Sequence, residues 1–222
     1  MLKYFSVALG VSVSLSVGTP IPPAVPSYLL GAAQRPPVEF AMALLTARVP
    51  CGLEIRESED RPHERPVSKI GPQGDVPLSD VVRAFEAHHR DYRAAVVGGV
   101  LVIRPRTDVL PFLDAPSTIS TPTPITGVMV ALRRVFSPLV PRWGRGGISI
   151  GSGGHGSGRE LRVVLDGRGG RTVIDTLNQI VLQAPGRAWE VVTRKDGASL
   201  RPVTVGFIDA DGYRRRHEIG GP

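Results

Sequence analysis

Cysteine and aromatic residues are scarce in this chain, and each scarcity excludes a class of protein. Cys51 is the single cysteine among 222 residues, so neither an intrachain disulfide nor a cysteine-based metal cluster can form. Aromatic residues make up 5% of the chain, which leaves few rings on which nucleic-acid bases could stack. After the first 18 residues there is no second apolar run of about twenty residues, the length that a membrane-spanning helix needs.

Sequence motifs of catalysis and cofactor binding are also absent. The glycine-rich stretch 144–159 contains no lysine, which a phosphate-binding P-loop requires, and we interpret it as a flexible linker. Gly167, Gly169 and Gly170 read G-x-G-G and so miss the dinucleotide-binding spacing. The adjacent residues His88 and His89 would point about 100° apart on a helix, and no histidine pair has i, i+4 spacing. We therefore expect a protein that is not an enzyme, with no cofactor and no metal site.

The N-terminus has the pattern of a targeting segment. Residues 1–18 combine one lysine with an uncharged run of small and apolar residues, which predicts a signal peptide. Small residues allow cleavage after Gly18 or after Ala33. We therefore expect an exported protein, periplasmic or secreted, although a folded first strand without a targeting role is the alternative. Residues 19–37 are rich in proline and are predicted to be a tether.

Periodicity predicts helices and strands in the first half of the chain. Apolar residues recur at helical spacing over 38–49 and 78–91, whereas 51–58 alternates as a half-buried strand does. Two valine-rich runs flank Gly98-Gly99, a pair suited to a two-residue hairpin turn. These elements define a first domain over 38–105, and a Pro- and Thr-rich linker over 106–124 follows it.

The same order of elements returns in the second half. Helices are predicted over 126–137 and 172–184, with strands at 159–167, at 188–194 and at 202–209. Thr172 and Asp175 nearly match a capping box at the start of the second of these helices. An offset of 95 residues superimposes the apolar positions of the two halves, so Leu78 falls on Val173 and Phe85 on Ile180.

The predicted fold class is α+β, with two small domains of related α-β-α-β-β topology, each a small sheet with packed helices. The second domain covers 125–210 and carries a glycine-rich insertion at 144–158, and a basic tail follows over 211–222.

The first domain resembles the short N-terminal domain shared by secretins and TonB-dependent receptors. The resemblance rests on the segment GDVPLSDVVRAFEAHHRDYRAAVVGGVLVIRP, preceded by VEFAMALLTARVPCGLEI. It covers 36–105, and 125–210 more loosely. In place of the small residues that usually end the family's second helix this chain has HHRD, and neither a secretin pore nor an outer-membrane barrel follows. The resemblance implies an envelope-side domain that docks on other proteins without catalysis, and it brings no site residues with it.

Two hypotheses for function follow. In the first, the protein binds another envelope protein or copies of itself by strand addition, with Val100, Val102 and Arg104 as the edge-strand contacts. In the second, it binds a polyanion, a nucleic acid or an anionic lipid surface. Residues 34–124 hold 11 Lys and Arg against 12 Asp and Glu, whereas residues 125–222 hold 15 against 8. The arginines that would contact an anion are Arg168, Arg171, Arg214, Arg215 and Arg216.

Overall fold

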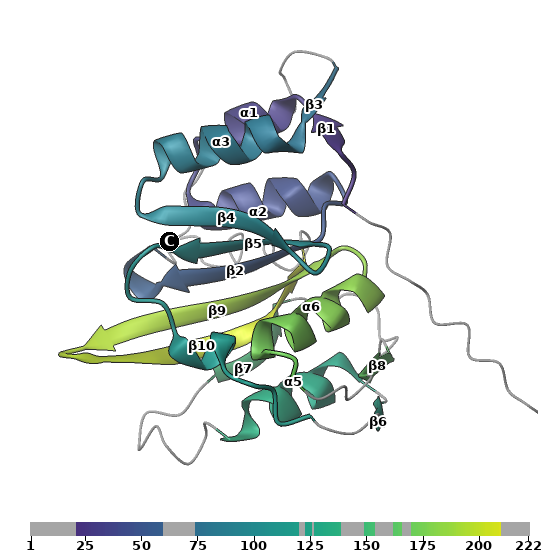
Figure 1. Ribbon diagram of the computed structural model, residues 1–222, viewed down its shortest axis with the longest axis vertical. Coiled ribbons are helices and arrows are strands. Elements are labelled where there is room, and N and C mark those ends of the chain that lie inside the picture. Colours follow the sequence, from purple (N-terminus) through teal and green to yellow (C-terminus); the bar gives the residue numbers. More distant parts are fainter. Residues whose placement is uncertain are drawn as a thin grey trace, which may run out of the picture.

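The computed structural model describes residues 21–59, 74–119, 123–125, 127–138, 149–153, 162–165 and 170–209. The fold is α+β, as the sequence predicts. A six-stranded mixed sheet lies between two layers of helices (Figure 1). The segments 1–18 and 211–222, predicted to be a signal peptide and a basic tail, lie outside the described residues.

In the first half, helices cover three neighbouring strands of the large sheet. The strands β2, β4 and β5 belong to the large sheet, and the helices α2 and α3 cover it. The strands β1 and β3 form a separate antiparallel pair. The bounds are β1 Ala24–Pro26, α1 Tyr28–Ala32, α2 Pro37–Thr46, β2 Cys51–Arg56, a 3-10 turn η1 Glu57–Glu59, β3 Asp75–Pro77, α3 Leu78–His88, β4 Tyr92–Val97 and β5 Val100–Pro105.

The second half repeats this order. A short helix connects the two halves, and another small antiparallel pair, β6 with β8, accompanies the strands of the large sheet. The bounds are α4 Pro111–Asp114, β6 Thr123–Ile125, α5 Val128–Phe136, β7 Ser149–Gly153, β8 Val163–Leu165, α6 Val173–Gln183, β9 Arg187–Asp196 and β10 Ser199–Asp209.

Strand pairing follows the same pattern in both halves. β4 pairs with β5 and β9 with β10 as antiparallel hairpins, while β2 lies parallel to β5 and β7 parallel to β10. The observed elements keep the offset of 95 residues, since α3 and α6 begin 95 residues apart and so do β4 and β9. The two halves therefore have one topology, which we call the first unit and the second unit.

The prediction that each half has a sheet of its own is wrong. The strands join in the order β4-β5-β2-β9-β10-β7, and β2 pairs in parallel with β9 from Gly52↔Trp189 to Arg56↔Thr193. Local sequence patterns carry no information on this pairing, because it joins residues about 137 positions apart.

The helices of the two units cover opposite faces of the sheet. The first core cluster combines α1, α2 and α3 with alternate residues of the strands, such as Leu101 and Ile103. The second core cluster combines α4, α5 and α6 with the residues between them, such as Val100 and Val102. Because β2 is parallel to β9 while the hairpins keep their internal pairing, corresponding strands run in opposite directions in the two units. The second unit is therefore turned by half a turn about an axis that crosses the strands.

Three segments that the sequence predicts as linkers contain ordered elements. The described part of the tether 19–37 holds β1 and α1, with Val25 and Leu29 buried. The linker 106–124 holds α4, whose Leu113 is buried. Within the glycine-rich insertion 144–158, β7 is a strand of the large sheet. In each segment tertiary pairing or burial supplies stability that the local composition does not suggest.

The predicted local motifs are present. Gly98 and Gly99 both have positive φ angles, 57° and 83°, as the type I′ hairpin turn requires. Thr172 Oγ1 accepts a hydrogen bond from the N–H of Asp175, whose carboxylate accepts one from the N–H of Thr172. This reciprocal pair is the capping box at the start of α6.

Candidate interaction edges and the junction between the units

The strands β4 and β7 form the two outer edges of the sheet, since each has one neighbouring strand among the described residues. The two-residue turn makes Val97 and Val100 a hydrogen-bonded pair, so alternate residues of β4 direct their N–H groups away from β5. Two observed contacts agree with this assignment. The N–H of Tyr92 donates to the carbonyl of His89, and that of Ala94 donates to Glu86 Oε1 at 2.8 Å. By the same alternation, the N–H of Val96 points outward.

Val96 combines this outward backbone with an exposed apolar side chain. Its exposed fraction is 55%, and among the described residues Val130 is the other large apolar side chain that is exposed. Edge strands with unpaired backbone groups can take up another strand. The edge at Val96 is therefore a place where a polypeptide could add to the sheet.

Glu86 restricts access to the same edge. It extends from α3, accepts the N–H of Ala94 and forms an ion pair with Arg106 at 3.2 Å. A side chain that occupies an edge donor is one way in which proteins limit unwanted strand pairing. Glu86 therefore has to leave Ala94 before a strand can pair along the whole of β4.

The residues predicted as edge contacts do not lie at an edge. Val100, Val102 and Arg104 belong to β5, which pairs with β4 on one side and with β2 on the other. Their exposed fractions are 0%, 4% and 3%. The prediction is wrong because the sequence identifies the hairpin but not which of its two strands faces β2.

Arg104 instead belongs to a buried ionic cluster beneath α4. Its Nε donates to Glu54 Oε2 at 2.6 Å, and its Nη1 donates to Asp114 Oδ1 at 2.7 Å. Glu54 Oε1 also accepts the N–H of Leu110 at 2.6 Å. Burial raises the pKa of the Glu54 carboxyl, and the adjacent Arg104 opposes that rise. For Arg104, burial acts to lower the pKa, but the bonds to Asp114 and Glu54 outweigh it and raise the pKa.

The cluster is structural, because Arg104 and Glu54 pair with each other in the interior and Asp114, whose side chain is 55% exposed, bonds to Arg104 from the surface. Glu54 and Asp114 were not singled out from the sequence. The sequence did offer one signal for Glu54, a carboxylate within the largely apolar strand 51–56. A strand that is covered on both faces must pair any charge that it buries.

The junction between β2 and β9 depends on Gly52. A Cβ atom placed on Gly52 would lie 2.0 Å from Cε2 of Trp189, so the indole occupies the space of the missing side chain. Trp189 is fully buried, and its Nε1 donates to Asn178 Oδ1 at 2.8 Å. Asn178 in turn donates to the carbonyl of Val97 at 2.9 Å. This chain of contacts ties α6 to the hairpin of the first unit.

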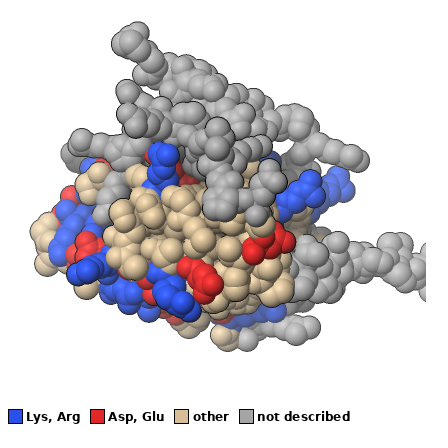
Figure 2. Space-filling view, turned by 90° about the horizontal axis from the view of Figure 1, so that it is seen from above, with Lys and Arg blue, Asp and Glu red and all other residues tan. Residues whose placement is uncertain are grey.

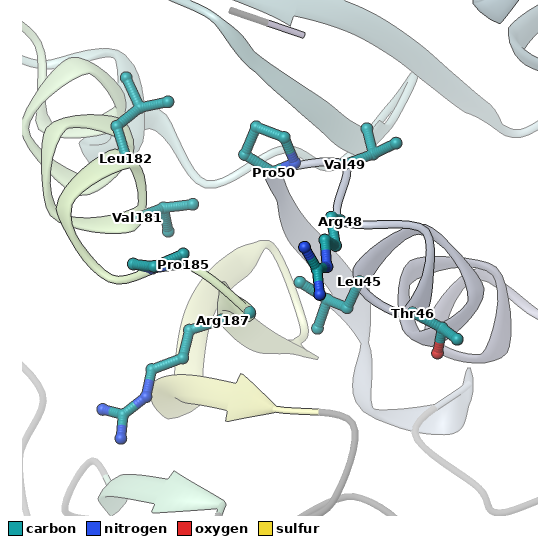
Figure 3. A pocket seen from close by; sticks show the side chains of 10 residues that line it. Leu45, Thr46, Arg48, Val49, Pro50, Val181, Leu182, Pro185 and Arg187 are labelled. Carbon is teal, nitrogen blue, oxygen red and sulfur yellow. The ribbon is translucent and has the colours of Figure 1, made fainter. Parts of the chain in front are cut away.

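A cavity of about 480 Å³ lies beside this junction, between the carboxyl ends of α2 and α6. Figure 3 shows Arg48 and Arg187 on opposite sides of it, with the end of the Arg187 side chain turned away from Arg48. Arg48 has a positive φ of 61° just after α2. Helix carboxyl ends favour nearby positive charge, which accounts for both arginines without a ligand.

A smaller cavity of about 260 Å³ lies where the β9–β10 hairpin meets η1. Four of its charged groups form ion pairs, Arg194 with Glu57 and Lys195 Nζ with Asp108 Oδ1 at 2.8 Å, while Arg56 donates to Thr107 Oγ1 at 3.4 Å. The hydrogen bond from Arg194 lowers the pKa of Glu57, and the bond from Lys195 lowers that of Asp108. These two pairs neutralise Arg194 and Lys195, two of the three cations of the lining.

Of the five arginines predicted to bind an anion, Arg171 is the one that lies in the part of the chain that the structure describes, so their common site stays a prediction. Arg171 donates from Nη1 to Gln179 Oε1 at 3.2 Å, whereas Arg168 and the three arginines 214–216 lie outside the described residues. On the one face that Figure 2 shows, seen from above Figure 1, basic side chains lie next to acidic ones around an uncharged area.

Cys51 is fully buried, with its Sγ 3.7 Å from the carbonyl oxygen of Ala41. Burial raises the pKa of its thiol to about 12, so the nucleophilic thiolate is scarce at neutral pH. Within the described ranges, no three His, Cys, Asp or Glu side chains cluster in a way that could hold a metal ion. No helix in the described part of the chain is long and apolar enough to cross a membrane.

Comparisons with known proteins return no relative: no protein-family model, no characterised protein and no solved structure matches the chain. The fold defines a class by itself, an α+β unit that occurs twice in the chain and whose two copies share one sheet.

Proposed function

We propose that this chain is an exported, non-catalytic module that binds other polypeptides by strand addition at the edge of its sheet. The observation that carries the proposal is the outward backbone of β4 at Val96, next to an exposed apolar side chain. Strand addition derives affinity from main-chain hydrogen bonds and selectivity from side-chain pockets. The edge offers both an outward N–H group and an apolar contact.

Two sequence features support the cellular setting of this proposal. The segment 1–18 has the pattern of a signal peptide, and the first half resembles the N-terminal domain of secretins and TonB-dependent receptors. Both would place the binding partner in the cell envelope or outside the cell. The docking site in the proposal is the outer edge of β4 and not β5.

The alternative, an anion-binding module, has less support in the described residues. Arg171 is hydrogen-bonded to Gln179, and two of the three basic side chains at the smaller cavity, Arg194 and Lys195, are paired with carboxylates. The alternative predicts binding that collapses as salt rises. Strand addition predicts binding that resists salt, because main-chain hydrogen bonds in a desolvated edge are weakly screened.

The proposal is tested with Val96→Pro, which removes one outward N–H but no hydrogen bond to β5. The matched control is Val96→Thr, which keeps the N–H and nearly the same shape. Tagged wild type and both variants are incubated with an envelope extract at low and high salt, with nuclease present. We expect wild type and Val96→Thr to retain the same polypeptides at both salt concentrations and Val96→Pro to lose them.

Equal retention by folded Val96→Pro would overturn edge docking at β4. Retention at low salt alone, of polyanion or anionic lipid, would favour the anion-binding alternative. Circular dichroism of each variant tests whether its fold is intact.

A further inference from the structure

We propose that the polypeptide taken up at the edge is a second copy of this chain, whose β7 pairs in parallel with β4 of the next copy. This inference rests on the proposed function and names its partner. It follows from the way in which the two units are joined inside one chain.

Each of the two strands that form the internal junction has an equivalent strand in the other unit. Inside the chain, β2 of the first unit pairs with β9 of the second unit. The equivalent of β9 in the first unit is β4, and the equivalent of β2 in the second unit is β7. Among the residues that the structure describes, these two strands form the outer edges of the sheet. Of each equivalent pair, one strand therefore lies in the internal junction and the other lies at an outer edge.

Strand registers define which residues correspond. The offset of 95 residues matches Ala94 with Trp189 and Val96 with Val191. Val96 pairs with Leu101 as Val191 pairs with Val205.

The same steps lead from the hairpins to the outer strands. Leu101 pairs with Cys51 as Val205 pairs with Ile150. One residue further along, Gly52 therefore corresponds to Gly151, so a glycine stands at the same position in both strands.

This correspondence predicts the register between copies. Inside the chain Gly52 lies beside Trp189, and Leu53 beside Glu190. The same pairing between copies places Gly151 beside Ala94 of the next copy and Ser152 beside its Ala95. Gly153 then lies beside Val96, the exposed apolar residue of the edge.

Strand direction and helix placement are compatible with this docking. A half-turn relates the first unit to the second, so a second half-turn restores the original orientation in the next copy. β7 and the neighbouring β4 then run parallel, as β2 and β9 do, and the helices again alternate between faces. Because neighbouring strands twist by roughly 20–25°, successive copies form an open row and not a closed dimer.

Two features make the junction between copies weaker than the internal one. The internal junction buries Trp189 against Gly52, whereas Ala94 takes that position between copies. Glu86 also occupies the N–H of Ala94 in the single chain. Self-association should therefore need a high protein concentration, and it should increase when Glu86 is removed.

The register is tested by disulfide trapping with Ser152→Cys and Ala95→Cys in one full-length chain. Neighbouring strands lie about 4.8 Å apart, within the Cα separation that a disulfide accepts. Native Cys51 is buried and should not compete. We expect a ladder of dimers, trimers and longer species after mild oxidation at high concentration.

The off-register control is Ser152→Cys with Arg93→Cys, which should cross-link at least about tenfold less. Equal cross-linking by both pairs would overturn the register. A single Ala95→Cys chain that gives the same yield of dimer as the pair would show that β4 pairs with β4 instead, and would also overturn the proposal.

Sedimentation of unlabelled protein separates this inference from the proposed function. Val96→Pro should weaken self-association at least about tenfold relative to Val96→Thr, the loss expected for a hydrogen bond in a desolvated junction. Glu86→Ala should strengthen it, whereas Glu86→Gln, which keeps an oxygen for Ala94, should not.

A wild-type chain that stays monomeric at the highest soluble concentration, together with a monomeric Glu86→Ala variant, would overturn self-pairing. If Val96→Pro still lost an envelope polypeptide in that case, edge docking would stand with a different partner.

Discussion

At the scale of single residues, Gly52 makes room for Trp189 where the two units meet in the sheet. Its missing side chain leaves the space that the Trp189 indole fills, and that indole donates to Asn178. The backbone of Gly52 has no positive φ, so the glycine is needed for close approach and not for an unusual backbone conformation. One hydrogen atom in place of a methyl group therefore allows a large aromatic residue to pack across the junction.

We expect Gly52→Ala to lower the free energy of unfolding by about 1–3 kcal/mol or more, because the new methyl group overlaps the indole. The control is Gly31→Ala in α1, where a Cβ meets no atom within 4 Å. That change should be neutral or slightly stabilising, since alanine favours helix. Urea unfolding of both variants measures the difference. A Gly52→Ala chain as stable as Gly31→Ala would contradict this account of the junction.

At the scale of elements, the buried ionic cluster attaches α4 to the sheet. Arg104 on β5 bonds to Glu54 on β2 and to Asp114 at the end of α4, and Glu54 also holds the N–H of Leu110. The helix has only four residues, too few for stability on its own. Side-chain contacts and the burial of Leu113 therefore keep it in place.

We expect Arg104→Met to destabilise the fold by about 3–5 kcal/mol at neutral pH, because the buried Glu54 carboxylate loses its ion-pair partner. Adding Glu54→Gln should recover part of the loss, since the amide carries no charge. Burial already raises the pKa of Glu54, and removal of Arg104 should raise it further. A raised folded-state pKa means that stability is lost as pH rises through it.

The difference in free energy of unfolding between wild type and Arg104→Met should therefore become smaller as the pH falls from 7 toward the ordinary carboxyl pKa. Urea unfolding across that range provides the measurement. A gap that stays constant, or a double variant whose loss equals the sum of the single losses, would show that Arg104 does not act through the charge of Glu54.

For the whole molecule, the shared sheet makes the two units interdependent. The first core cluster takes Ala188, Val192 and Ile208 from the second unit, and the second cluster takes Val100 and Val102 from the first. Separation of the units would expose these residues together with the edges of β2 and β9. We therefore describe one folding unit built from two similar parts.

We expect the chain to unfold in a single cooperative transition. Residues 1–119 and 120–222 produced separately should each lack a cooperative transition, and their co-expression should restore the complex. Calorimetry and circular dichroism provide the measurements. A fragment 1–119 that unfolds cooperatively with the midpoint of the intact chain would contradict the shared core.

The sequence alone determined the features that depend on neighbouring residues. Helical periodicity located α2, α3, α5 and α6, and the Thr172–Asp175 pair marked where α6 begins. Gly98-Gly99 predicted the hairpin turn, because both turn positions need positive φ. The recurrence of apolar positions at an offset of 95 residues predicted the duplicated topology. Each of these signals acts over a few residues, or repeats a pattern of such signals.

Only the tertiary structure decided how the two units combine and which strands remain at the edges. The pairing of β2 with β9, the position of β5 inside the sheet and the inclusion of β7 depend on contacts between distant residues. The free energy of such contacts comes from apolar burial and from main-chain hydrogen bonds, which any compatible strand can supply. The sequence of one strand therefore does not identify its neighbour, and Gly52 acquires its role only when Trp189 lies beside it.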